Sequence, residues 1–72
     1  MTATEWGQMA AANDIKLNKK KSDKDSIYNQ GKSLAGFATK LPAKNAVETE
    51  AQRRNDYETA YNDYMKSHGK AS

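Results

Sequence analysis

The stretch from residue 45 to residue 69 is the longest regularly periodic part of the chain, and its pattern predicts one α-helix. Its residues recur at alternating steps of four and three, which places them on one side of a helix. These residues are Ala43, Val47, Glu50, Arg54, Tyr57, Tyr61, Tyr64 and His68, flanked by Ala46 and Met65. The opposite side carries only polar and charged residues. Asn45 with Glu48 is a capping-box-like start, and Gly69 is a suitable stop in the left-handed C′ conformation.

A shorter helix is predicted over residues 3–16. Thr2 and Glu5 have the spacing of a capping box, and the alanine run at 10–12 favours helix. Gly7 and the Asn13–Asp14 pair weaken the prediction. The apolar face of this helix is predicted to comprise Trp6, Met9, Ala10, Asn13 and Leu17. Trp6 is either the anchor of this helix against the others or an exposed hot spot for a partner.

Between these two helices, a third is predicted over about 23–41, with Ser22 or Asp23 as its N-cap and Pro42 marking its end. Its apolar face would comprise Ile27, Gly31, Leu34, Phe37, Ala38 and Leu41. Gly31 on this face would let another helix approach closely. The short connection before residue 45 predicts an antiparallel hairpin of helices 23–41 and 45–68. We therefore expect an all-α fold in one domain over 1–72, with the leading helix packed across the hairpin and a polar tail at 69–72.

Large aliphatic and phenylalanine side chains are scarce. Leu, Ile, Val and Phe supply only 7 of the 72 residues, and a share below about a fifth already leans toward disorder. There is no cysteine, which excludes disulfides and thiolate metal sites. A monomer of this composition should be weakly stable. We expect the chain to self-associate, to dock on another protein, or to stay partly unfolded until it does.

Positive charge is concentrated in the middle of the chain. Residues 16–44 carry 8 lysines and 2 aspartates, whereas the whole chain has a net charge of only +3. Residues 18–25 form a polar, charge-dense linker that contains Lys19, Lys20, Lys21 and Lys24. The linker is interpreted as a solvated connection, with a basic patch for the phosphates of nucleic acid as the alternative. Nucleic-acid binding would be favoured if folding brought these lysines beside Arg53 and Arg54.

No pattern in the chain predicts an active site, a metal site or a cofactor site. The one histidine, His68, falls in the last turn of the predicted 45–68 helix, where the helix dipole favours its charged form. Nucleophilic catalysis and metal binding both need several converging groups, so we expect no enzyme. No apolar run approaches a membrane span, and no signal peptide is recognisable. We expect a cytoplasmic protein, or a virion-interior protein if the chain is phage-encoded.

The strongest functional signal is the tyrosine stripe of the 45–68 helix, which consists of Tyr57, Tyr61 and Tyr64. Three tyrosines at helical spacing most often form a packed internal face of the fold. The functional interpretation is that part of the stripe extends past the shorter 23–41 helix and offers aromatic area to a partner. The predicted partner-binding residues are Tyr57, Tyr61, Tyr64, Met65 and Trp6. Glu50 and Arg54 fall on the same stripe, either as a half-exposed pair at its rim or as a polar layer that fixes register. The sequence thus predicts a non-enzymatic protein-binding module, such as an inhibitor or assembly component; the alternative is a nucleic-acid-associated regulator.

Overall fold

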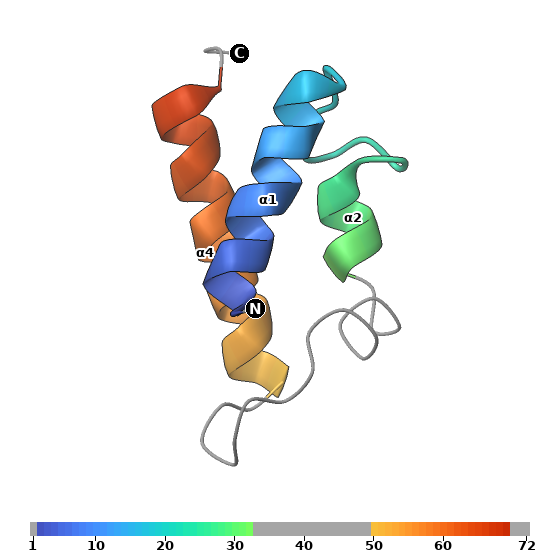
Figure 1. Cartoon of the computed structure of the whole chain (residues 1–72). Helices are drawn as coiled ribbons and strands as arrows, with labels where there is room; N and C mark the ends of the chain where they lie inside the picture. Colours follow the sequence, from blue (N-terminus) through green and yellow to red (C-terminus); the bar gives the residue numbers. More distant parts are fainter. Residues whose placement is uncertain (1, 33–49, 70–72) are drawn as a thin grey trace.

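The computed structural model describes residues 2–32 and 50–69, and these residues form three α-helices (Figure 1). The helices are α1 (Ala3–Lys16), α2 (Ile27–Lys32) and α4 (Glu50–His68). The all-α prediction of a three-helix arrangement is confirmed. The later part of the predicted 23–41 helix, the connection with Pro42, the start of the 45–68 helix with Val47, and the tail at 70–72 lie outside the described residues.

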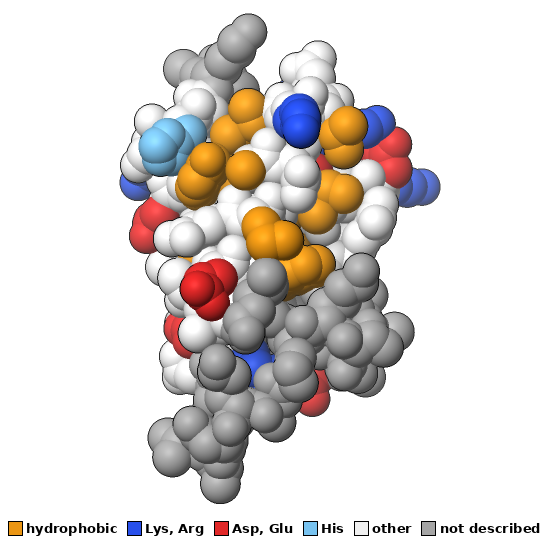
Figure 2. Space-filling view, viewed as in Figure 1, with side chains coloured by type: hydrophobic (Ala, Val, Ile, Leu, Met, Phe, Trp, Pro, Cys, Tyr) orange, Lys and Arg blue, Asp and Glu red, His pale blue; other side chains and the backbone are white. Residues whose placement is uncertain are grey.

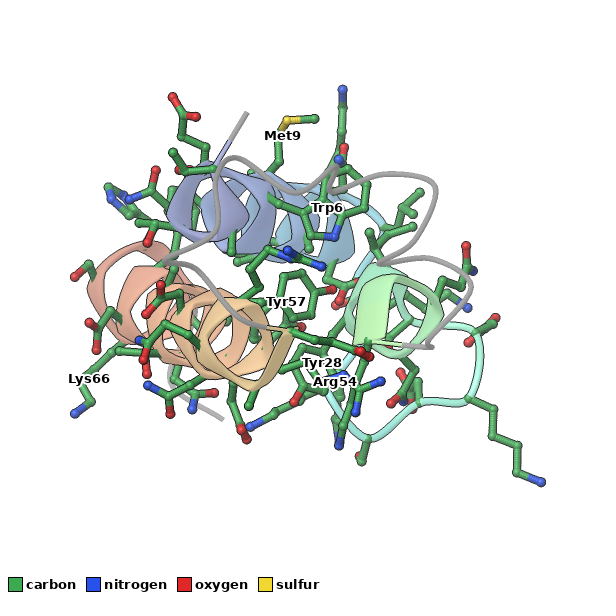
Figure 3. All side chains as sticks on the ribbon, turned by 90° about the horizontal axis from the view of Figure 1, so that it is seen from below. Trp6, Met9, Tyr28, Arg54, Tyr57 and Lys66 are labelled. Carbon is green, nitrogen blue, oxygen red and sulfur yellow. The ribbon has the colours of Figure 1, made fainter. Side chains whose placement is uncertain are left out.

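The three helices stand at the corners of a triangle when viewed along their axes (Figure 3). α1 and α4 run in the same direction, and α2 runs opposite to both (Figure 1). α2 and α4 are therefore antiparallel, as the hairpin prediction requires. The main packing partner of α4, however, is α1, and α2 packs chiefly on α1. Residues near the two ends of the chain thus form the largest helix interface.

Both ends of α1 are fixed by local hydrogen bonds. The predicted capping box is present: Thr2 Oγ1 accepts from the Glu5 N–H at 3.0 Å, and Glu5 Oε1 accepts from the Thr2 N–H at 2.8 Å. At the other end Asn18 has a φ of 59°, the left-handed conformation that asparagine tolerates. The N–H of Asn18 bonds the Ile15 carbonyl and that of Lys19 bonds the Asp14 carbonyl. This Schellman motif explains why the helix stops at Lys16, as predicted.

The start of α2 differs from the prediction. Ser26, not Ser22 or Asp23, precedes the first helical residue, and its Oγ accepts from the Asn29 N–H at 3.0 Å. The preceding residues fold into tight turns, in which the Lys20 N–H bonds an Asp23 carboxylate oxygen at 2.7 Å. Asn29 donates its side-chain amide back to carbonyls of this linker. The linker therefore has a defined turn structure, and α2 begins only after these turns, at Ile27.

The buried face of α1 was predicted only in part: Ala10 is buried and Trp6 packs against the core, as predicted. Met9 and Leu17, expected on the core side, are 43% and 54% exposed. The residues that α1 buries are mostly small: Ala3, Gly7, Ala10, Ala11 and Asp14. Small side chains allow the backbones of two helices to approach closely, so contact with α4 selects this face over the face with the larger apolar residues.

Gly7 packs directly against the backbone of α4, so a side chain at this position is expected to destabilise the fold. A Cβ at Gly7 would collide with the Tyr57 carbonyl oxygen and would lie 2.9 Å from the Ala60 Cβ. Alanine is a better helix former than glycine by about 1 kcal/mol. The clash outweighs this gain, because the backbone of α4 cannot move aside as a flexible side chain could. We expect Gly7→Ala to lower the free energy of unfolding by about 1–3 kcal/mol in a urea titration. The exposed neighbour Gln8→Ala is the control, and a stabilised Gly7→Ala protein would contradict this packing.

The buried residues of α4 are Tyr57, Ala60 and Tyr61. Glu50 and Arg54 form the predicted pair at 2.7 Å, with roughly half of each side chain in solvent, so it is a rim pair and not a buried polar layer. α4 ends at His68, as predicted, but Gly69 does not take the predicted left-handed conformation. The Gly69 N–H bonds the Met65 carbonyl at 2.9 Å, and no described glycine has a positive φ. The helix therefore ends without a left-handed C′ residue.

Candidate functional site

Tyr57 lies at the centre of the helix triangle (Figure 3) and is 1% exposed. Its ring stacks on Tyr28 with centroids 5.4 Å apart and on Trp6 at 6.5 Å. Its hydroxyl donates to the carbonyls of Tyr28 and Ile27, at 2.8 and 3.2 Å. A single side chain of α4 thus contacts both other helices, which makes Tyr57 a core residue of the fold.

Gly31 of α2 packs directly against this aromatic centre. A Cβ at Gly31 would collide with the Tyr57 hydroxyl and would lie 2.7 Å from Trp6 Nε1. The prediction that Gly31 permits a close approach is therefore confirmed. Tyr28, which the sequence placed off the apolar stripe, is only 3% exposed. α2 therefore contributes the ring of Tyr28 to the core.

Asp14 is a fully buried carboxylate that joins all three helices. Its Oδ1 accepts from the Ile27 N–H at 2.7 Å, and its Oδ2 accepts from the Tyr28 N–H at 3.1 Å. The Tyr61 hydroxyl donates to the same Oδ2 at 2.7 Å. Asp14 therefore caps the first N–H groups of α2 from another helix. The sequence prediction treated this residue only as a helix-weakening aspartate.

The position of Tyr61 corrects another expectation. Tyr61 was expected toward the far end of its helix, beyond the reach of the 23–41 helix. It is 1% exposed, and its ring centroid lies 4.7 Å from that of Tyr28 in α2. The turn and loop that precede α2 bring its first residues level with the middle of α4. Tyr57 and Tyr61 are consequently inside the fold, and neither can contact a partner unless the fold opens.

The buried tyrosines remain protonated across the physiological range. Burial raises the pKa of Tyr57 and that of Tyr61, and the hydrogen bond from the Tyr61 hydroxyl to Asp14 raises the latter pKa further. Burial and the neighbouring Glu58 carboxylate also raise the pKa of Tyr28. A phenol with a raised pKa is a poor nucleophile but a dependable hydrogen-bond donor. These groups suit structural roles and not catalysis.

Two of the four lysines of the 18–25 linker contact acidic groups of the same molecule. Lys19 pairs with Asp25 at 2.6 Å. Lys21 Nζ lies 3.0 Å from both Glu58 Oε2 and Asn62 Oδ1 of α4, and 4.9 Å from the Tyr28 ring centroid. The hydrogen bond to Lys19 lowers the pKa of Asp25, and that to Lys21 lowers the pKa of Glu58.

These contacts bear on the nucleic-acid alternative. Of the four linker lysines, only Lys20 and Lys24 are exposed. Lys21 meets a carboxylate of α4, whereas Arg54 pairs with Glu50 at another turn of the same helix. A phosphate backbone would have to compete with the ion pairs of Lys19 and Lys21, which weakens the case for a basic patch at this linker.

Three of the predicted partner-binding residues retain exposed surface: Trp6, Tyr64 and Met65 are half-buried and pack at the edge of the core. Tyr64 borders an open groove between α1 and α4, and its ring centroid lies 4.3 Å from that of His68. The groove is lined by Thr4, Gln8, Thr59, Ala60, Asp63, Tyr64, Ser67 and His68. Hydrophobic side chains gather beside the histidine on this face (Figure 2).

Neither a metal site nor a membrane span is found in the described part of the chain. No group of at least 3 His, Asp or Glu residues in residues 2–32 and 50–69 could hold a metal ion. None of the described helices is long and apolar enough to cross a membrane. No protein-family model matches this chain, and comparisons with curated proteins and with solved structures found no significant match.

Proposed function

We propose that this chain is a small, non-enzymatic protein-binding module that docks on a larger protein through the groove between α1 and α4. Tyr64 is the central contact, with Met65 and His68 beside it. The observation that carries the proposal is the contact of the half-buried Tyr64 ring with the exposed His68 ring on an open groove. Tyrosine is enriched at the centres of protein interfaces because its ring gives contact area and its hydroxyl a polar handle.

The dimensions and lining of the groove favour a protein over a small molecule. Its volume is about 260 Å³, below the range of about 300–1,000 Å³ typical of small-molecule sites. Ala60 and the Tyr64 ring are apolar parts of the lining, and α1 and α4 both add hydroxyl or amide groups to it. Aromatic and apolar surface combined with hydrogen-bonding groups is usual at a protein interface.

We expect Tyr64→Ala to remain folded and to lose the partner. Tyr64 is only half-buried and its truncation leaves Tyr57 and Tyr61 in place, while alanine favours helix. Loss of an aromatic anchor typically costs about 2 kcal/mol of binding, or roughly thirtyfold in affinity. The tagged variant and the unmodified protein would be used to capture partners from lysate of the source, with quantitative mass spectrometry as the readout.

Asn55→Ala is the matched control, since Asn55 is exposed on α4 and does not line the groove. It should capture the same proteins as the unmodified chain. Circular dichroism would verify that both variants are helical. A Tyr64→Ala protein that captures its partner at undiminished yield would show that the groove is not the docking surface.

A further inference from the structure

The outer face of α1 carries a short stripe of residues at steps of four, three and four: Glu5, Met9, Ala12 and Lys16. This stripe lies opposite the small residues that face α4. Met9 points away from the other helices (Figure 3) and is 43% exposed. Glu5 and Lys16 are exposed, and Ala12 is half-buried. The spacing is that of the a and d positions in a two-helix seam.

The stripe is complementary to itself when a second α1 lies antiparallel to it. In that arrangement Glu5 of each copy meets Lys16 of the other, and Met9 of each copy meets Ala12 of the other. The two ion pairs would flank two contacts that each join a large and a small apolar residue. We propose that two copies of this chain associate through this face of α1, with a two-fold axis midway between Met9 and Ala12.

Charge complementarity identifies a second copy as the occupant of this face. A two-fold axis requires the acid and the base to lie at equal distances on either side of it, and Glu5 and Lys16 meet this requirement. Lys16 forms no ion pair with another residue in the described part of the chain. The carboxylate of Glu5 accepts from the Thr2 N–H, and a carboxylate can accept several hydrogen bonds at once.

The dimer is expected to be weak and reversible. One face of a 14-residue helix offers less area than the roughly 1,200 Å² that stable complexes bury. The unmodified full chain should therefore show a concentration-dependent monomer–dimer equilibrium by sedimentation, in the range of about micromolar to millimolar. A chain that remains monomeric throughout that range would overturn the proposal.

A charge swap gives the decisive test. Lys16→Glu replaces both attractive pairs of the dimer by repulsive ones, and we expect the dissociation constant to rise at least about tenfold. The double variant Glu5→Lys with Lys16→Glu re-forms both pairs with reversed sign and should return to within about threefold of the unmodified chain. In the unmodified chain, Glu5 near the start of α1 and Lys16 near its end both interact favourably with the helix dipole. The double variant loses both interactions and should be less helical than Lys16→Glu. A recovery of dimerisation in the double variant can therefore come only from ion pairing between copies.

Lys24→Glu is the matched control, because Lys24 is exposed in the linker and lies off this face. It should dimerise as the unmodified chain does. If Lys16→Glu fails to fold, Met9→Lys replaces it, because lysine four residues after Glu5 supports the helix and removes only the apolar contact. Unchanged dimerisation by Lys16→Glu or Met9→Lys would place the contact elsewhere, as would no recovery in a double variant that circular dichroism shows to be folded despite the loss of the Glu5 capping contact. Tyr64→Ala should dimerise normally, so this result is independent of partner docking.

Discussion

Asp14→Ala is expected to lower the free energy of unfolding by about 3–5 kcal/mol, because three donors, two of them buried, would lose their acceptor together. These donors are the N–H groups of Ile27 and Tyr28 and the hydroxyl of Tyr61. A chain of 72 residues at the usual stability per residue has only about 4–11 kcal/mol in all. The variant should therefore be largely unfolded, or unfold at much lower urea, as measured by circular dichroism.

Two further variants make the Asp14 result specific. Asp14→Asn keeps the size and one acceptor oxygen, so its loss of stability should be intermediate. Asp56→Ala removes a carboxylate whose hydrogen bond, from the Gln52 side chain at 3.0 Å, lies at the surface, and it should change stability by less than about 0.5 kcal/mol. If Asp14→Ala costs no more than Asp56→Ala, the buried carboxylate does not join the helices.

Tyr57→Ala is expected to have an effect of similar size, about 3–5 kcal/mol, as for other large aromatic side chains removed from a core. The substitution leaves a cavity between Trp6 and Tyr28, and it removes the hydroxyl that bonds two α2 carbonyls. We expect this variant to lose both the near-ultraviolet circular dichroism signal of Trp6 and the cooperative unfolding transition.

Tyr57→Phe separates the ring from its hydroxyl. It retains the stacking on Tyr28 and should cost only about 1 kcal/mol, the usual net value of a hydrogen bond. The half-buried Tyr64→Ala is a second comparison on the same helix. A Tyr57→Ala protein as stable as Tyr64→Ala would mean that the stacked rings do not form the core.

Local patterns predicted the parts of the fold that depend on neighbouring residues. The capping box predicted the start of α1; the stop at Asn18 is also a local interaction, but it was not recognised in the sequence. The start of α2 could not be predicted in this way. Its first N–H groups bond Asp14, more than 12 residues earlier in the chain, so helix begins at Ile27 and not at the earlier candidate caps.

The candidate site was predicted only in part, because periodicity places residues on a side of a helix without saying what covers that side. Tyr61 and Tyr64 lie on the same predicted stripe, yet Tyr61 contacts Tyr28 and is buried, whereas Tyr64 borders an open groove. The position of α2 along α4 makes this difference. That position depends on the path of the 18–25 linker, which the sequence prediction treated as a solvated connection.

The sequence by itself determined that the chain is helical, where α1 begins and ends, and which α4 residues share a side, because these properties arise from interactions between near neighbours. Tertiary structure alone decided which face of α1 is buried. Hydrophobicity favours Met9 and Leu17, but close contact with α4 requires Gly7 and the alanines. It also decided that Asp14 is a core residue, since a carboxylate is stable inside a protein only where donors from other elements converge on it.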